Sequence, residues 1–261
     1  MLSNPWQAGD FAKIAPSAMI VSEVLCDAVP IYAGERVLDI GCGSGNTATA
    51  AARRRAVVTG VDPVEKLLAA AQARAAFENL EIDWHHGSAE DLPFADAAFD
   101  VALSTYGMIF STDPSKAVAE AARVLVPGGR LALTSWTEHG MIDEFFAALE
   151  DVMPDMAMIP VARAWGRQDD ARARLASHFS EIRMIERTVY MRAPDMARWL
   201  AGMKKFLGPF VLAYESLSPE GANALDERIL GLSNLSPKAS NGSFFAEVPY
   251  LEIHGIRAAS I

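Results

Sequence analysis

The sequence predicts an α/β fold in which a parallel sheet is covered by helices on both faces. Between residues 36 and 136, short apolar runs rich in β-branched residues alternate with alanine-rich stretches of helical pattern. The first apolar run leads into a glycine-rich turn that opens a helix. The length of 261 residues suits one domain that carries an insertion.

The alternating pattern predicts five strands and three helices in this part of the chain. Pro127-Gly128-Gly129 ends the last of these helices, because proline cannot continue the helical hydrogen bonds and glycine readily adopts positive φ. The strands are expected at residues 36–40, 57–61, 80–85, 99–104 and 130–135, and the helices at 47–55, 64–77 and 114–125.

The chain beyond Trp136 has a different composition. A methionine-rich segment at 141–158 precedes helical patterns at 169–176 and 193–206, and two further strands are expected at 182–191 and 247–256. The interval between these two strands is far too long for a hairpin turn. We therefore expect a single domain over 1–261, with a core at 34–140 and a helical cap formed by residues 141–165 and 192–246.

Charge and cysteine content limit the classes of partner. The chain has 23 Lys and Arg against 33 Asp and Glu, so its net charge of −10 repels nucleic-acid phosphates. The two cysteines, Cys26 and Cys42, do not form a ligand pair, which favours a reducing cytoplasm. The sequence has no signal-peptide pattern and no apolar run long enough for a membrane span. We expect a cytoplasmic protein without a nucleic-acid partner.

The glycine loop indicates the kind of ligand. Gly41, Gly43 and Gly45 follow the spacing Gly-x-Gly-x-Gly, whereas a dinucleotide loop has Gly-x-Gly-x-x-Gly. Asp39, two residues before the first glycine, would repel a pyrophosphate but can serve an ammonium group, directly or through water. This combination points to the methionine part of S-adenosylmethionine. A nicotinamide-dependent oxidoreductase is the alternative that the strand and loop leave open.

Asp62 ends the second predicted strand, 21 residues beyond Gly41. At that distance an acidic side chain can accept hydrogen bonds from the ribose hydroxyls of an adenosine that lies across the sheet edge. Aspartate before Pro63 also suits the N-cap of the following helix, and both roles can coexist.

Three further motifs carry a family resemblance. Residues 87–94 read Gly-Ser-Ala-Glu-Asp-Leu-Pro-Phe, residues 98–102 read Ala-Phe-Asp-Val-Ala, and residues 123–131 contain Pro127-Gly128-Gly129. With the glycine loop, they resemble the class I S-adenosylmethionine-dependent methyltransferases of the ubiquinone and menaquinone biosynthesis type, from about Gly34 to Trp136. The resemblance implies a Rossmann-like, seven-stranded sheet with an antiparallel last strand. The cofactor would lie across the carboxyl ends of the first strands.

The resemblance also implies roles for single residues. Ser88, Ala89 and Glu90 would face the adenine, and Thr105 and Tyr106 would flank the sulfonium. Serine at 88 departs from the family, which usually has an aspartate there to accept from the adenine amino group. The cofactor contacts expected in all are Asp39, Gly41, Cys42, Gly43, Asn46, Asp62, Pro63, Ser88, Ala89, Glu90 and Thr105.

Catalysis by such an enzyme depends mainly on alignment of the acceptor atom, the methyl carbon and the sulfur, which can supply about 7–11 kcal/mol. If a base is used, His139 after the fifth strand is the best-placed histidine, although it also suits a polar loop. Tyr106 could orient the acceptor or only pack.

No histidine has metal-site spacing. The fourth strand ends in Leu103-Ser104-Thr105-Tyr106-Gly107, which lacks the Asn-Pro-Pro-Tyr motif of DNA methyltransferases and the acidic ligands of magnesium-dependent catechol methyltransferases. We therefore expect metal-independent transfer to a small molecule. A non-catalytic nucleotide-binding protein is a second alternative, and the acceptor atom and the oligomeric state stay open.

Overall fold

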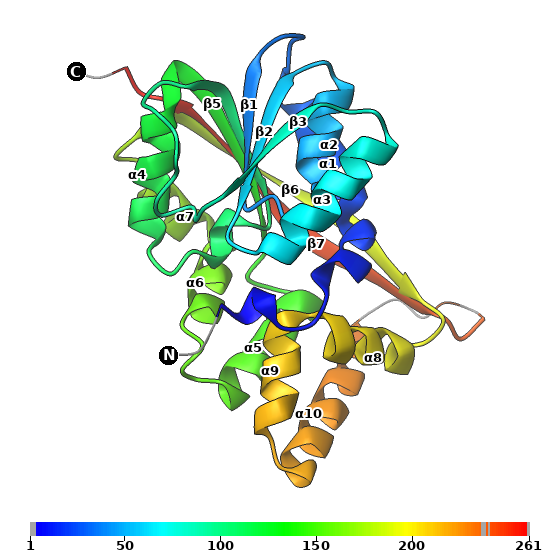
Figure 1. Cartoon of the computed structure of the whole chain (residues 1–261). Coiled ribbons are helices and arrows are strands. Elements are labelled where there is room, and N and C mark those ends of the chain that lie inside the picture. Colours follow the sequence, from blue (N-terminus) through cyan, green and yellow to red (C-terminus); the bar gives the residue numbers. More distant parts are fainter. Residues whose placement is uncertain (1–3, 236–238, 240, 260–261) are drawn as a thin grey trace.

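One seven-stranded sheet forms the centre of the protein (Figure 1). The computed structural model describes residues 4–235, 239 and 241–259. The strand order is β3-β2-β1-β4-β5-β7-β6, and only β7 runs antiparallel to its neighbours. This confirms the expected sheet with an antiparallel last strand. The strands are β1 (Arg36–Ile40), β2 (Val57–Asp62), β3 (Ile82–His86), β4 (Phe99–Thr105), β5 (Leu125–Trp136), β6 (Phe179–Ala193) and β7 (Phe244–Arg257).

Helices cover both faces of this sheet, as the non-alternating apolar strands predict. In β1 the adjacent residues Val37 and Leu38 are both fully buried, and they belong to separate clusters on opposite faces. The first face carries α1 (Met19–Ala28), α2 (Asn46–Arg53) and α3 (Glu65–Phe77), and the second carries α4 (Pro114–Val124), α6 (Met158–Ala164) and α7 (Gln168–Leu175).

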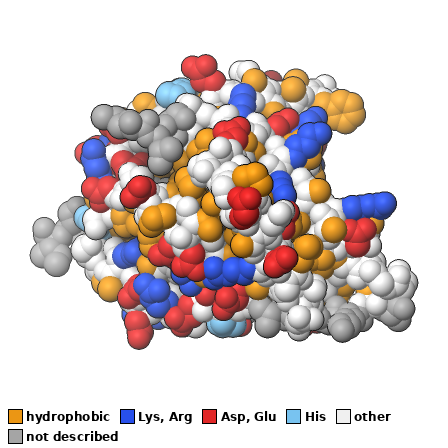
Figure 2. Space-filling model, turned by 90° about the horizontal axis from the view of Figure 1, so that it is seen from below, with side chains coloured by type: hydrophobic (Ala, Val, Ile, Leu, Met, Phe, Trp, Pro, Cys, Tyr) orange, Lys and Arg blue, Asp and Glu red, His pale blue; other side chains and the backbone are white. Residues whose placement is uncertain are grey.

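A second layer of helices lies beyond the carboxyl end of the parallel strands (Figure 1). Its core contains Phe145 stacked on Phe210, with ring centroids 4.1 Å apart, and Trp199 against the edge of Phe145. Figure 2 views the molecule from this side, where acidic and basic side chains are interspersed among hydrophobic ones. The layer consists of α5 (Met141–Val152), α8 (Met196–Phe206), α9 (Gly208–Ser216), α10 (Pro219–Gly231) and η5 (Leu232–Leu235).

The N-terminal segment lies between the sheet edge and the second layer. The backbone N–H of Asp10 donates to the carbonyl oxygen of Phe206 in α8, and Lys66 of α3 donates to the carbonyl oxygens of Gln7 and Gly9. A Cβ on Gly208 would lie 2.1 Å from the carbonyl oxygen of Pro5, so this contact requires glycine. The segment comprises the short helices η1 (Pro5–Gln7), η2 (Phe11–Lys13) and η3 (Ala15–Ala18).

Most element boundaries differ from the prediction by one to three residues, and two differences have a clear physical cause. Strand β5 begins at Leu125, where the sequence predicted the end of a helix, because Leu125 pairs with Phe99 before residues 126–129 bulge out of the sheet. Helix α8 begins at residue 196 and not at 193. The carboxylate of Asp195 accepts from the backbone N–H of Arg198 at 2.7 Å and so caps the helix at this point.

Candidate active site

The glycine loop between β1 and α2 borders the candidate site. Gly41, Gly43 and Gly45 all have positive φ, which glycine adopts without steric cost. A Cβ on Gly41 would lie 2.8 Å from the Cα of Gly107, so glycine allows the loops after β1 and β4 to meet. A Cβ on Gly43 would meet no atom within 4 Å. The loop is therefore open to a ligand at Gly43.

Asp62 connects the end of β2 to this loop. Its Oδ2 accepts from the backbone N–H of Gly43 at 2.8 Å, and its Oδ1 accepts from the backbone N–H of Val64 at 2.9 Å. Burial raises the pKa of Asp62, and the two backbone hydrogen bonds oppose that shift. Because each carboxylate oxygen has two lone pairs, Asp62 can hold the loop and still accept from ribose hydroxyls.

Asp39 lies beneath the loop. Its Oδ2 accepts from the backbone N–H of Ala48 at 2.8 Å, and its Oδ1 is buried without a partner among the described residues. Burial raises the pKa of Asp39 to about 7. The carboxylate therefore stabilises the start of α2 and is absent from the cavity wall, in contrast to the expected ligand contact.

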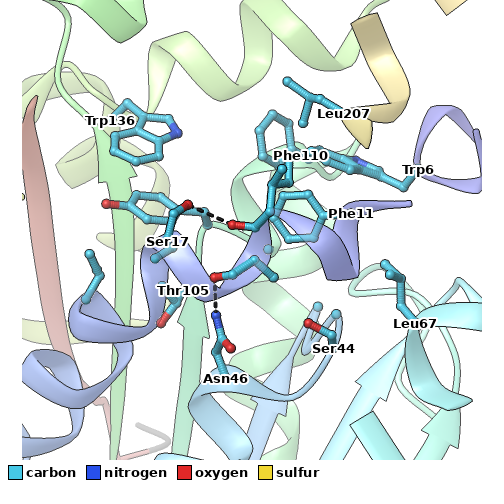
Figure 3. A pocket seen from close by; sticks show the side chains of 18 of the residues that line it. Trp6, Phe11, Ser17, Ser44, Asn46, Leu67, Thr105, Phe110, Trp136 and Leu207 are labelled. Atoms are coloured by element: carbon cyan, nitrogen blue, oxygen red, sulfur yellow. Dashed lines mark hydrogen bonds between the residues drawn. The ribbon is translucent and has the colours of Figure 1, made fainter. Parts of the chain in front are cut away.

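A cavity of about 920 Å³ extends from the glycine loop to the second layer of helices (Figure 3). It is large enough for a drug-sized ligand together with further groups. The structure brings most of the predicted site residues to its wall, and Asp39 and His139 are the exceptions. The predicted residues on the wall are Gly41, Cys42, Gly43, Asn46, Asp62, Pro63, Ser88, Ala89, Glu90, Thr105 and Tyr106.

The loops after β3 and β4 are joined at this wall. Oε1 of Glu90 accepts from the backbone N–H of Thr112 at 2.8 Å, and the carbonyl oxygen of Ser88 accepts from the backbone N–H of Asp91. Ser111, which also lines the cavity, is buried and its hydroxyl has no partner among the described residues. Polar groups therefore remain for a ligand at this end of the cavity.

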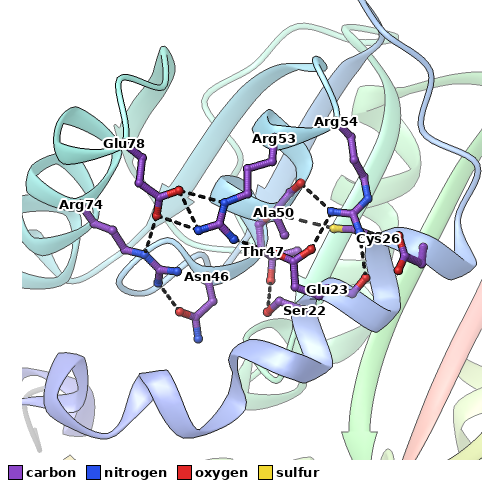
Figure 4. Close-up of polar contacts among 11 residues, drawn as sticks. Ser22, Glu23, Cys26, Asn46, Thr47, Ala50, Arg53, Arg54, Arg74 and Glu78 are labelled. Atoms are coloured by element: carbon purple, nitrogen blue, oxygen red, sulfur yellow. Dashed lines mark hydrogen bonds and ion pairs between the residues drawn. The ribbon is translucent and has the colours of Figure 1, made fainter.

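Asn46 holds the N-terminal segment onto α2 (Figures 3 and 4). Its Nδ2 donates to the carbonyl oxygen of Ala15 at 2.8 Å, and its Oδ1 accepts from the guanidinium of Arg74. Arg74 also pairs with Glu78, which accepts two hydrogen bonds from Arg53. Asn46 borders the cavity, but both ends of its amide already have partners.

Three hydroxyl groups meet where β4 ends. Oγ1 of Thr47 donates to Oγ1 of Thr105 at 2.8 Å and lies 3.0 Å from Oγ of Ser22 in α1. All three residues line the cavity. The sequence predicted only Thr105, because no local pattern relates Ser22 to Thr47 of α2, which lies 25 residues further along the chain.

Tyr106 follows Thr105 with a φ of +56°, an uncommon conformation for a residue other than glycine. Its ring stacks on Trp136 with centroids 3.9 Å apart, and its hydroxyl is buried without a partner among the described residues. Burial raises the pKa of Tyr106 well above 10. The hydroxyl therefore stays protonated at neutral pH and can donate a hydrogen bond.

His139 lies away from this cavity. Its side chain is 59% exposed, and Nε2 is 3.6 Å from Oε1 of Glu186 in β6. The carbonyl oxygen of His139 accepts from Oγ1 of Thr137, so the chain turns away from the cavity directly after Trp136. The structure does not bring His139 together with Tyr106, and the geometry does not support its predicted role as a base.

The wall opposite the glycine loop is mainly aromatic and methionine-rich. Figure 3 shows Trp6, Phe11, Phe110, Trp136 and Leu207 around the cavity. Trp6 packs edge-on against both Phe11 and Phe110. Trp6 and Phe110 were not predicted as site residues, and only the apolar character of their segments could have indicated them. Further members are Ile142, Phe145, Phe146, Met158, Val189, Met191, Trp199 and Met203.

In residues 4–235, 239 and 241–259, no cluster of three or more His, Cys, Asp and Glu side chains could hold a metal ion. Within the same ranges, every helix is too short or too polar to cross a membrane.

Sequence comparisons agree with this geometry. The methyltransferase domain family matches residues 38–133. An uncharacterised protein of Mycobacterium tuberculosis is 35% identical over 234 residues, which cover 87% of this chain and 85% of that protein. The 27-O-demethylrifamycin SV methyltransferase of Amycolatopsis mediterranei is 38% identical over 125 residues, which cover 47% of this chain and 46% of that enzyme.

Solved structures share the fold at low sequence identity. The YcgJ protein of Bacillus subtilis superposes with a TM-score of 0.64 at 22% identity, covering 92% of this chain and 100% of that one. A phosphoethanolamine N-methyltransferase of Haemonchus contortus, solved with S-adenosyl-L-methionine, gives a TM-score of 0.59 at 17% identity, with coverages of 92% and 53%.

The chain belongs to the class I S-adenosylmethionine-dependent methyltransferases. Its cofactor is S-adenosylmethionine. The residues present fit this cofactor, because Gly43 leaves the loop open and Asp62 keeps free lone pairs beside it. The more specific resemblance to the ubiquinone and menaquinone type stays a prediction.

Proposed function

We propose that the protein transfers the methyl group to an apolar small molecule held between the sheet edge and the second helical layer. The observation that carries this proposal is the continuity of the cavity, which reaches from Gly43 and Asp62 to Phe146 and Trp199. A donor and an acceptor that share one cavity can be held in line for transfer.

The sheet edge would hold the cofactor. The backbone of Gly43 allows close approach, Asp62 accepts from the ribose hydroxyls, and Ser88 and Glu90 line the adenine end. When bound, S-adenosylmethionine supplies a methyl group that the positive sulfur has already activated. The protein therefore needs to bind, orient and exclude water, and a general base is not required by the donor.

The second layer would hold the acceptor. It corresponds to most of the cap expected at residues 141–165 and 192–246, although α6 within the first of these segments packs on the sheet. Phe110, Phe146 and Met158 give the wall an apolar surface that adapts to the shape of a ligand. Tyr106 lies on the cavity wall, and its buried hydroxyl has no partner among the described residues. We assign to Tyr106 the role of orienting the acceptor.

The name of one relative supports a small-molecule acceptor. One relative is named for 27-O-demethylrifamycin SV, an organic small molecule, and we propose an acceptor of that broad class here.

Cys26 and Cys42 are both free and buried, which supports a location in the cytoplasm.

Isothermal titration calorimetry with S-adenosylhomocysteine and with NAD tests the cofactor half. We expect S-adenosylhomocysteine to bind and NAD to give no heat of binding. The reverse result would overturn the assignment of Gly43 and Asp62 to this cofactor.

A further inference from the structure

Strand β6 forms one edge of the sheet. It is 15 residues long and pairs with β7 along most of its length, but among the residues that the structure describes its other edge has no strand partner. Such an edge presents unpaired backbone N–H and C=O groups that can pair with another chain. Proteins often interrupt long edge strands to prevent this. In β6 the interruption lies between Ser180 and Arg183, so residues 183–193 remain one regular segment.

The two faces of this segment differ, because successive side chains of a strand point to opposite faces. Val189 is buried in the core of the second layer. The opposite face is open, and Tyr190 on it stacks on Phe245 of β7 with ring centroids 5.3 Å apart. The guanidinium of Arg192 lies over both rings. The exposed side chains of this face in β6 are Glu186, Thr188, Tyr190 and Arg192.

Two charges on this face are available to a partner. Arg192 forms no ion pair with a described residue and donates only to the carbonyl oxygen of Tyr190, at 3.4 Å. Glu186 lies 3.6 Å from Nε2 of His139, and both of these side chains are about half exposed, so this contact is weak. The edge strand therefore carries a cation and a carboxylate on one exposed face.

These charges fit a second copy of the same strand. When two copies pair antiparallel about a twofold axis perpendicular to the sheet, residues at equal distances before and after the axis lie opposite each other, on the same face. With the axis at Val189, Arg192 of one copy lies opposite Glu186 of the other. Tyr190 then lies opposite Thr188. Each charged pair forms twice, once on either side of the axis.

Other registers are less favourable. An axis at Glu186 or Arg187 would place that charge opposite its own copy. An axis at Thr188 or Tyr190 would place an uncharged residue opposite Arg192. Opposite charges directly across two antiparallel strands stabilise the pairing, and like charges destabilise it. The charges therefore select one register.

We propose that two copies of this protein associate edge to edge through β6, antiparallel, about a twofold axis at Val189. The two seven-stranded sheets then form one continuous sheet. Each Arg192 gains a carboxylate partner in Glu186 of the partner subunit, and the two stacks of Tyr190 on Phe245 lie diagonally across the axis on the same face. This inference goes beyond the proposed function and does not depend on the acceptor.

Sedimentation equilibrium of the full chain tests the association and should show a dimer at micromolar concentrations. Glu186→Arg should raise its dissociation constant by about tenfold or more, since both contacts with Arg192 become repulsive. The same change makes the acidic chain less negative, so a purely global charge effect would tighten the dimer. Combining Glu186→Arg with Arg192→Glu restores opposite charges and should return the constant to within about threefold of the original.

Glu247→Arg is the matched control. It makes the same charge change on the same exposed face, but on β7, one strand away from the edge. It should not weaken the dimer, and thermal unfolding checks that each variant is folded. A protein that stays monomeric at micromolar concentrations would overturn the inference. A dimer that Glu186→Arg leaves unchanged or tightens would do the same.

Cysteine cross-linking tests the register independently of charge. Thr188 and Tyr190 of the two copies would lie opposite each other with Cα atoms about 4.5–5.5 Å apart, which a disulfide can span. An oxidised mixture of Thr188→Cys and Tyr190→Cys chains should therefore give a covalent dimer, and either variant alone should not. The native cysteines, Cys26 and Cys42, are buried. A mixture without covalent dimer, or equal cross-linking by one variant alone, would contradict the register.

Discussion

The carboxylate of Asp62 accepts a 2.8 Å hydrogen bond from the backbone N–H of Gly43. The end of β2 thereby holds the loop that follows β1, although 19 residues separate the two in the sequence. Asp62 also lines the cavity, at the place where we propose that the ribose binds. Asp62 therefore stabilises the glycine loop and is also positioned to bind the ligand.

Asp62→Ala should weaken both the stability of the protein and its affinity for the cofactor product. We expect S-adenosylhomocysteine affinity to fall by about 1.5–3 kcal/mol, the range for lost hydrogen bonds to a charged group, and the melting temperature to fall as well. Calorimetry and thermal unfolding measure the two effects. Asp83→Ala, at an exposed position on the neighbouring β3, serves as the control. A lower melting temperature with unchanged affinity would reduce Asp62 to a structural residue.

Gly43→Val should abolish S-adenosylhomocysteine binding. The new side chain would project from the loop into the open cavity, since a Cβ at this position meets no atom within 4 Å. Gly128→Val is a matched control, because Gly128 also has positive φ and open surroundings but lies outside the cavity. Both variants should lose similar stability. Binding that survives in a folded Gly43→Val protein would place the cofactor elsewhere.

Asp39→Asn should change how stability depends on pH. Burial raises the pKa of Asp39 from its usual 3.8 to about 7, so the folded state holds this proton more tightly than the unfolded state. The raised pKa of Asp39 therefore contributes fully to the free energy of unfolding below about pH 4. This contribution falls by about 1.4 kcal/mol per pH unit between about pH 4 and pH 7 and no longer changes above about pH 7. Urea unfolding between pH 4 and 8 should show a shallower decline for Asp39→Asn. Parallel curves for the two proteins would contradict the raised pKa.

Tyr106→Phe should stabilise the protein by about 1 kcal/mol and lower kcat/KM. The variant removes a buried hydroxyl without a described partner and keeps the stack on Trp136. Tyr214→Phe should instead lower the stability of the protein, because the hydroxyl of Tyr214 donates to Asp226 at 2.6 Å and this hydrogen bond would be lost. Denaturant unfolding compares the two variants. Unchanged turnover in a stabilised Tyr106→Phe would leave its hydroxyl without a role in the reaction.

His139→Ala should leave kcat and KM within about twofold of the unmodified protein, since its side chain is exposed beside Glu186 and does not line the cavity. The measurement is transfer of a labelled methyl group to an acceptor found by screening. A large loss of kcat alone would restore His139 as a base and would require the turn after Trp136 to rearrange.

Local patterns predicted the parts of the site that lie on consecutive residues. Gly43 and Asp62 could be found because the strand, loop and helix signals surround them closely. The partners of Asn46 and Thr47 could not, since Ala15 and Ser22 reach them only after α1 packs on the sheet. The position of His139 depends on a turn whose direction is set by contacts with β7, including Thr137 with Pro249. Such long-range packing has no periodic signal in the sequence.

The N-terminal segment is bonded on both sides. Asn46 holds the carbonyl oxygen of Ala15 on the sheet side, and Phe206 accepts from Asp10 on the α8 side. A movement that separates α8 from the sheet edge would have to extend this segment or break its attachments on one side. Residues 5–18 therefore connect the sheet edge to the second layer. The length to which this segment can extend limits how wide a passage can open for reactants to enter and products to leave.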